Sequence, residues 1–140
     1  SLPLHAALPI PLSDAISKAR YDRILLLNHY SILDTDSDPL FNSRIVVEFI
    51  REHKIEHVFC GHTHQLSIMR STDLYHGHTF TQYKNGSLSS SNTPNDTNMF
   101  LYYENFGTDA MVIHVVRGTV KNNSLIFKEE IIPYFPVAEN

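Results

Sequence analysis

In Val58-Phe59-Cys60-Gly61-His62-Thr63-His64, an apolar run stops at a glycine and two histidines follow with one residue between them. The apolar run has the length of a buried β-strand. At the end of such a strand, Gly61 allows the backbone to turn sharply. His62 and His64 can then converge on a ligand bound in front of the sheet. We therefore predict a metal site at this strand end.

A strand and a helix are predicted before this segment. Residues 23–27 form a largely apolar run that ends at Asn28-His29-Tyr30, which is typical of a strand buried on both faces. Between residues 42 and 53, apolar side chains recur at helical spacing, which predicts an amphipathic helix packed on a sheet. A strand, a helix and a strand in this order normally form a right-handed parallel crossover. The two strands then end at one edge, which brings His29 toward His62 and His64.

The rest of the chain adds one short helix and a series of strands. We assign no structure to residues 1–12, and we expect a helix that enters at Pro11 and Ser13, with Ser13 as N-cap. We treat residues 1–140 as one α/β domain, with an α/β part at 13–64 and a mainly β part at 65–135. Loops are expected at 34–39 and 87–98, and antiparallel strands at 66–70, 75–83, 100–106, 110–117 and 125–132.

Composition and charge restrict the classes of function. A length of 140 residues suffices for one compact domain with a core. A net charge of -4 and the lack of a basic stripe argue against a nucleic-acid face. No apolar run is long enough for a membrane span. A single cysteine, Cys60, excludes an internal disulfide framework and is interpreted as a small core residue. We therefore expect a cytoplasmic protein.

Several of these residues together resemble a known family. A strand ending in Asn28-His29-Tyr30-Ser31, a helix, and a strand ending in Gly61-His62-Thr63-His64 resemble the C-terminal half of the calcineurin-like metallophosphoesterases. Within the resemblance, which covers residues 12–88, Asn85-Gly86-Ser87 is similar to the loop after the family's next strands. Asn85-Gly86 is equally typical of a hairpin turn. The resemblance implies the C-terminal part of a four-layer α/β/β/α sandwich.

The resemblance also implies a site and a chemistry. His29 and His62 would be ligands of one divalent metal ion, and His64 would be a ligand of a second ion. Imidazole suits Mn, Fe or Zn. Two such ions activate a hydroxide and hold the phosphoryl oxygens during displacement. The function implied is hydrolysis of a phosphodiester or phosphomonoester, with a nucleotide favoured as the substrate. The loops contain no recognisable substrate-binding residue.

The chain also departs from the family's pattern. Its Asp-x-His, Gly-Asp and Gly-Asn-His motifs have no match in this sequence. About half of the expected metal ligands and the histidine that protonates the leaving group are therefore missing, and we assign no catalytic side chain. We expect the missing ligands to come from an N-terminal half or from a second copy of the chain.

The other histidines have simpler interpretations. His76 and His78 would share one face of a strand, as part of a polar sheet face, with an accessory substrate contact as the alternative. His53 and His57 flank a helix end, where a cation is favourable. His114 lies in an apolar strand and is interpreted as a hydrogen-bonded structural residue.

Two further functions stay open at this point. The chain could be a catalytically incomplete module whose sheet face binds a partner or the missing half. It could also be a small histidine module that holds one structural Zn, for which Asp36, Asp38 or His78 could supply the fourth ligand. The number of metal ions bound per chain distinguishes these functions from a two-metal phosphoesterase.

Overall fold

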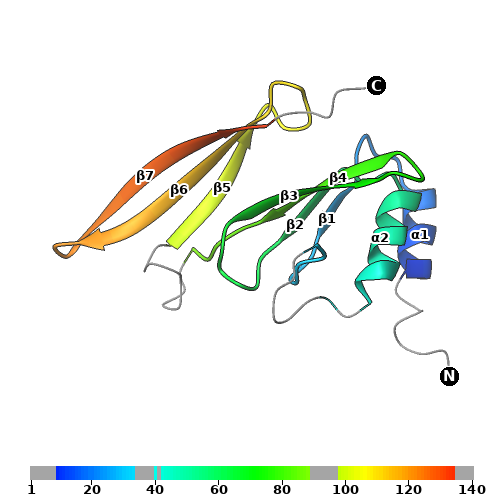
Figure 1. Cartoon of the computed structure of the whole chain (residues 1–140), viewed down its shortest axis with the longest axis horizontal. Helices are drawn as coiled ribbons and strands as arrows, with labels where there is room; N and C mark the ends of the chain where they lie inside the picture. Colours follow the sequence, from blue (N-terminus) through cyan, green and yellow to red (C-terminus); the bar gives the residue numbers. More distant parts are fainter. Residues whose placement is uncertain (1–8, 34–39, 41, 89–97, 135–140) are drawn as a thin grey trace. The chain divides into compact units, whose positions relative to one another are not determined.

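The computed structural model describes residues 9–33, 40, 42–88 and 98–134, and the chain divides into two compact units. The first unit comprises residues 1–60 and 68–83, and the second comprises residues 61–67 and 84–140. The elements confirm a mixed α/β chain with few helices (Figure 1). They are α1 (Pro9–Lys18), β1 (Leu25–Leu27), α2 (Ser43–Glu52), β2 (His57–Cys60), β3 (Ser67–Asp73), β4 (His78–Lys84), β5 (Asn98–Glu104), β6 (Val112–Lys121) and β7 (Ser124–Pro133).

The first sheet has the strand order β1-β2-β4-β3. Strands β1 and β2 are parallel, with Leu25 paired with His57 and Leu27 with Phe59, and α2 lies between them in the chain. This confirms the predicted strand-helix-strand arrangement. Strands β3 and β4 are joined by a turn in which the Gly77 amide donates to the Asp73 carbonyl oxygen at 2.7 Å.

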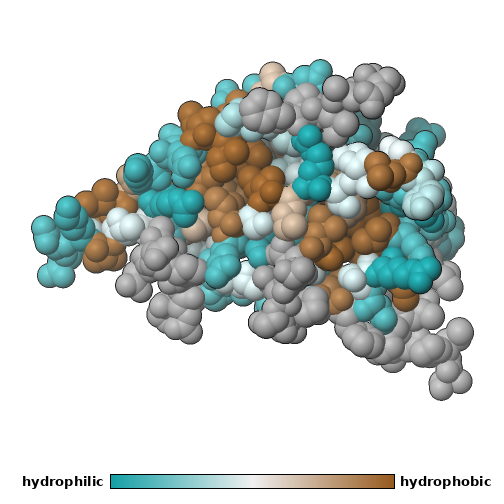
Figure 2. Space-filling model, in the orientation of Figure 1, coloured by the Kyte–Doolittle hydropathy of each residue, from teal (hydrophilic) through white to brown (hydrophobic). Residues whose placement is uncertain are grey.

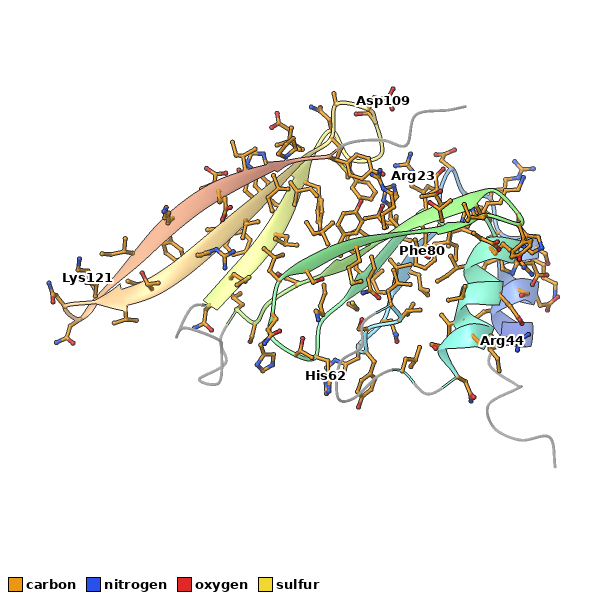
Figure 3. All side chains as sticks on the ribbon, in the orientation of Figure 1. Arg23, Arg44, His62, Phe80, Asp109 and Lys121 are labelled. Carbon is orange, nitrogen blue, oxygen red and sulfur yellow. The ribbon has the colours of Figure 1, made fainter. Side chains whose placement is uncertain are left out.

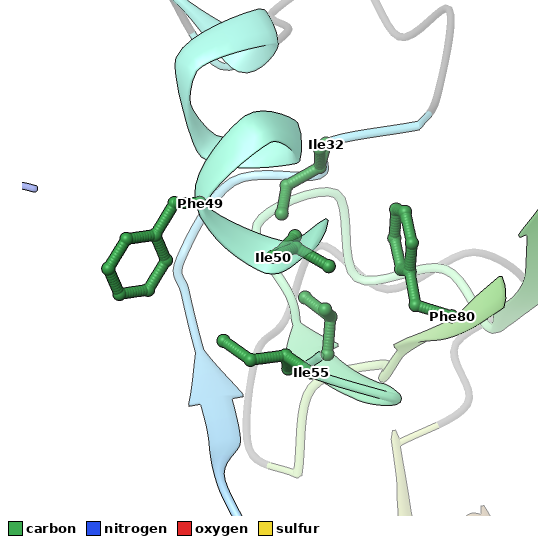
Figure 4. Packing of buried hydrophobic residues seen from close by; sticks show 6 residues of the cluster. Ile32, Phe49, Ile50, Ile55 and Phe80 are labelled. Carbon is green, nitrogen blue, oxygen red and sulfur yellow. The ribbon is translucent and has the colours of Figure 1, made fainter. Parts of the chain in front are cut away.

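The core of the first unit lies between α2 and the sheet. Ile50 of α2 and Val58 of β2 are both 0% exposed. Figure 4 shows Ile50 beside Ile32, Ile55 and Phe80, which belong to the same buried cluster. The apolar positions of α2 face the strands because they recur at helical spacing, as the sequence predicts.

Helix α1 begins earlier than the sequence indicated. We expected residues 1–12 to be irregular and Ser13 to be the N-cap, but the helix starts at Pro9 and includes Ser13. Prolines are tolerated in a first helical turn because the amides there have no partner within the helix. The Ser13 hydroxyl instead makes a hydrogen bond of 2.8 Å with His53 Nε2 at the end of α2.

Strand β1 is not buried on both faces, which corrects our prediction for residues 23–27. The strand comprises only three residues, and Leu25 and Leu27 are 43% and 76% exposed. Leu26 packs against the core cluster, as does Ile24 just before the strand. The reason is positional, because β1 is the edge strand of its sheet and only one of its faces lies toward the helices.

The second sheet, in the second unit, is antiparallel with the order β5-β6-β7. It confirms the predicted antiparallel strands of the C-terminal half. Strands β6 and β7 pair from Lys121 with Ser124 to Val112 with Pro133. The two residues between them, Asn122 and Asn123, have φ values of 51° and 58°. Two left-handed residues in a two-residue loop match the right-handed twist of a hairpin.

Neither α1 nor α2, the two helices of the described residues, is long and apolar enough to cross a membrane. Cys60 is buried, as predicted for a small core residue. The loop predicted at 34–39 and most of the loop predicted at 87–98 lie outside the described residues. The arrangement as part of a four-layer sandwich stays a prediction.

Candidate functional site

The segment after β2 has an unusual backbone. His62 and His64 have φ values of 71° and 57°, so that both lie in the left-handed region. This region is uncommon for residues other than glycine and costs on the order of 1–3 kcal/mol per residue. Between the two histidines, the Thr63 amide donates to the Gly61 carbonyl oxygen at 3.0 Å. Figure 3 shows His62 in the loop that follows β2. Two left-handed histidines in three residues mark this loop as a candidate site.

Gly61 does not have the role that the sequence suggested. We expected it to provide the sharp turn, but its φ lies outside the left-handed region, and His62 and His64 provide the turn instead. A Cβ atom at Gly61 would have no heavy atom within 4 Å among the described residues. Neither backbone conformation nor packing therefore requires a glycine here.

Two buried side-chain oxygens have no hydrogen-bond partner among the described residues. They are Thr63 Oγ1 and Asn85 Oδ1, and both belong to the second unit. A buried polar atom without a partner costs about 1–3 kcal/mol, so each such atom in a folded protein requires an explanation. Both lie in segments that the family resemblance had marked.

Asn85-Gly86 is not a hairpin turn. The two residues follow β4 in irregular backbone, and the next strand, β5, belongs to the other sheet. The Met99 amide donates to the Ser87 carbonyl oxygen at 2.9 Å. A Cβ atom on Gly86 would lie 2.4 Å from Met99 Cγ, so this position requires a glycine for packing.

His29 lies two residues beyond the end of β1. The Asn28 amide before it donates to the Phe59 carbonyl oxygen at 2.8 Å and so continues the pairing of β1 with β2. The His29 ring is exposed and makes an edge-to-face contact with Tyr30, with ring centroids 5.0 Å apart. His29 belongs to the first unit, whereas His62 and His64 belong to the second.

The described residues contain no group of three or more His, Cys, Asp or Glu side chains that could hold a metal ion. They therefore do not fit a complete metal centre by themselves. Ligation of a metal by His29, His62 and His64 stays a prediction.

His53 and His57 differ in their surroundings. His53 is the C-cap of α2, as its predicted position at a helix end implies. His57 is buried at the start of β2, and its Nδ1 lies 3.0 Å from the Tyr83 hydroxyl. Burial lowers the pKa of His57, and Arg23 adds to this effect while Glu56 opposes it. A favourable cation near a helix end therefore does not explain His57.

His76 and His78 do not share a strand face. His76 lies in the turn between β3 and β4, where its Nδ1 is 2.7 Å from Asp73 Oδ2. His78 begins β4, and its Nε2 donates to the Ile55 carbonyl oxygen at 2.8 Å. The predicted alternation fails because the turn begins two residues before His76.

His114 is hydrogen-bonded, as predicted, but by two acids. Its Nδ1 lies 2.7 Å from Glu129 Oε1 on β7, and its Nε2 lies 3.3 Å from Glu104 Oε2 on β5. The ring stacks on Tyr102 with centroids 4.1 Å apart. With both nitrogens occupied, this cluster is a structural bridge across three strands.

The same cluster changes the acidity of its members. Hydrogen bonds from the Tyr102 hydroxyl and then from His114 lower the pKa of the Glu129 carboxyl. The carboxylate of Glu129 in turn raises the pKa of Tyr102. Glu129 is therefore held as an anion on the surface of β7.

Comparison with known proteins identifies solved structures of low similarity. No protein-family model and no curated protein matches the chain. Among solved structures, a double mutant of Vps29 from Entamoeba histolytica matches with a TM-score of 0.37 and 16% identity, over 70% of this chain and 51% of that chain. A single mutant of the same protein matches with a TM-score of 0.34 and 14% identity. This chain thus spans about half the length of the structures it matches, and similarity at this level carries no information about function.

Sequence patterns located some of these features and missed others. The glycine-histidine pattern located His62 and His64, and the family resemblance located Asn85. No sequence pattern indicated that acids surround His114, because Glu104 and Glu129 become its neighbours only through the register of β5, β6 and β7.

Proposed function

We propose that this chain is the C-terminal, histidine-bearing part of a metal-dependent phosphoesterase, with His29, His62 and His64 as ligands of two divalent ions. The backbone of the Gly61-His62-Thr63-His64 segment is the observation that carries the proposal, because left-handed conformations of residues other than glycine cluster at functional sites. The proposed substrate is a phosphodiester or phosphomonoester, with a nucleotide favoured, and the proposed location is the cytoplasm.

Two properties of the surrounding residues support a ligand at this segment. Thr63 Oγ1 is buried without a hydrogen-bond partner among the described residues, and Gly61 has space for a side chain that it does not carry. A buried polar atom without a partner is often completed by an ion or a water molecule.

The proposal requires further ligands. The described residues contain no group of three potential ligands, and the proposed sources of the others are an N-terminal half or a second copy of the chain. The proposed ions are Mn, Fe or Zn, which imidazole ligands suit.

Zinc titration monitored by NMR of the imidazole nitrogens tests the proposal directly. We expect the ring signals of His62 and His64, and then of His29, to shift on addition of Zn²⁺. Those of His114 should not move, since hydrogen bonds to carboxylates occupy both of its ring nitrogens. Hydrolysis of a generic activated phosphodiester with Mn²⁺ is the second readout.

Substitution variants supply the controls. His62→Ala should abolish the zinc-dependent shift of His64, whereas His76→Ala, in the β3–β4 turn, should leave it unchanged. A chelator should reverse every shift. If His62 and His64 do not respond to millimolar Zn²⁺, or if His76→Ala and His62→Ala have the same effect, the proposal is wrong.

A further inference from the structure

Strand β7 is a long and exposed edge strand. It lies at one end of the order β5-β6-β7 and has no further strand beside it among the described residues (Figure 1). An edge of this kind presents unpaired backbone amides and carbonyls that can pair with another chain. Its apolar side chains are exposed as well: Leu125 59%, Ile126 47%, Phe127 59% and Ile131 59%.

Exposed apolar side chains also lie on the faces of the second sheet. In the view of Figure 2, apolar and hydrophilic residues are interspersed over its strands. On the face that carries His114, the cross-strand pairing places Phe127 and Leu125 beside Gly118 and Val120. Val120 is 74% exposed. Exposed apolar side chains beside an open strand edge are typical of an interaction site.

The charges of β7 indicate which partner fits. Two identical strands that pair antiparallel around a two-fold axis through the sheet place residues opposite each other whose side chains share a face. Centred on Glu129, this pairing places Lys128 opposite Glu130 of the second copy, and does so twice by symmetry. The apolar residues then meet in pairs, with Phe127 opposite Ile131 and Ile126 opposite Ile132.

The neighbouring registers lack this match. Centred on Lys128, the pairing places Lys128 opposite itself and Glu130 opposite Ile126. Centred on Glu130, it places Glu130 opposite itself and Lys128 opposite Ile132. Like charges or a charge opposite an apolar side chain are unfavourable across strands. The register centred on Glu129 is the one that gives both lysines a carboxylate.

We propose that the chain forms a homodimer through antiparallel pairing of β7 with β7 of a second copy, centred on Glu129, so that the two three-stranded sheets form one continuous sheet. This surface is independent of the histidine segment discussed above. The backbone edge supplies the hydrogen bonds of the interface, and the Lys128 and Glu130 pairs set its register.

The one unfavourable pair in this register is Glu129 with Glu129 of the second copy. Each of these carboxylates already accepts hydrogen bonds within its own chain, from the Tyr102 hydroxyl and from His114 Nδ1. Contacts of this kind offset the repulsion between the two carboxylates. The cluster around His114 thereby makes the centre of the interface tolerable.

Charge reversal on β7 tests the register. The oligomeric state of the full chain is measured by sedimentation velocity between low and high micromolar concentrations. Lys128→Glu places a second carboxylate opposite Glu130 at both symmetric positions, and we expect the dimer dissociation constant to rise about tenfold or more. The fold should persist, because residue 128 is paired with Arg117 of β6. The carboxylate introduced by Lys128→Glu would therefore lie beside a cation of its own chain. Circular dichroism checks that the variant is folded.

A mixing experiment separates this register from other modes of association. Glu130→Lys places two ammonium groups opposite each other, one of them from Lys128, and should also give monomers. The Lys128→Glu variant carries two carboxylates at positions 128 and 130, and the Glu130→Lys variant carries two ammonium groups at these positions. When the two variants are mixed, these opposite charges should pair and a heterodimer should form. The double variant K128E/E130K should dimerise as the original chain does.

Lys121→Glu serves as the control for net charge, because Lys121 lies at the tip of the β6–β7 hairpin and on β6 (Figure 3). We expect it to dimerise normally. A chain that is monomeric at several hundred micromolar would overturn the proposal. So would a dimer that resists Lys128→Glu and Glu130→Lys but dissociates with Phe127→Ser, since the sheet face rather than the edge would then be the interface.

Discussion

Strands β2 and β7 are both rich in apolar residues, yet one is buried and the other exposed. Three of the four residues of β2 are buried, and the fourth is half-buried. In β7, nine of the ten residues are exposed. Helix α2 packs its apolar side chains against β2, whereas β7 ends its sheet with one open edge. Apolar content therefore predicts a strand, but the strand is buried only where another layer, such as a helix, packs against it.

The largest expected effect is on stability, and it compares a buried side chain over β2 with an exposed one on β7. Ile50→Ala in α2 removes a completely buried side chain from the cluster over β2, and we expect a loss of about 2–5 kcal/mol in the free energy of unfolding. Leu125→Ala in β7 should change it by less than about 0.5 kcal/mol. Urea denaturation in dilute solution measures both. Equal losses would contradict the comparison.

The next prediction tests how tightly the buried side of the second sheet is packed. Met99, Ile113 and Val115 are buried there. Gly86→Ala would place a methyl group 2.4 Å from Met99 Cγ, and we expect it to cost about 1–3 kcal/mol. Gly61→Ala, which meets no heavy atom within 4 Å among the described residues, should be close to neutral. A neutral Gly86→Ala would mean that Met99 can move away, so that this side of the sheet is loosely packed.

A third prediction concerns the pH dependence of the free energy of unfolding, to which the buried His57 of β2 contributes. Because burial lowers the pKa of His57 below its ordinary value of 6.5, the unfolded chain binds a proton there more readily than the folded chain. Stability should therefore fall as the pH drops from about 7.5 through 6.5 toward the lowered pKa. Urea midpoints at a series of pH values measure the slope. His57→Gln should flatten it, and an unchanged slope would show that His57 is not its source.

The smallest effect is expected at the exposed hairpin next to β7. Asn123 has a φ of 58°, which glycine adopts without strain, and Asn-Gly is the favoured loop for this geometry. Asn123→Gly should raise the free energy of unfolding by about 0.5 kcal/mol, and Asn123→Ala should lower it by about 1 kcal/mol. Thermal unfolding of the two variants tests this. The opposite order would exclude a left-handed residue at this position.

Local patterns predicted most elements of the fold. The helical spacing of residues 42–53 predicted α2, and the β-branched and aromatic runs predicted β3 to β7 to within a few residues. The pattern of β1 was misinterpreted because a run of leucines does not show whether a strand is central or at an edge. The start of α1 was placed too late because prolines were taken as a boundary rather than as first-turn residues.

For the candidate site, residue types were easier to predict than conformations. The sequence located the histidine segment, but it assigned the turn to Gly61, whereas His62 and His64 adopt the left-handed conformations. The paired positions of His76 and His78 were also wrong, because a period of two holds only inside a strand and His76 lies in a turn.

The sequence was sufficient to predict the class of fold, the parallel pair β1 and β2, and the position of the histidine segment, since these depend on local periodicity and on glycine and histidine spacing. The tertiary structure established which apolar strands are covered and which are open. It also decided that His114 meets Glu104 and Glu129, and that Thr63 is buried without a partner among the described residues. Burial and pairing of this kind depend on contacts between residues far apart in the chain, and no local pattern records them.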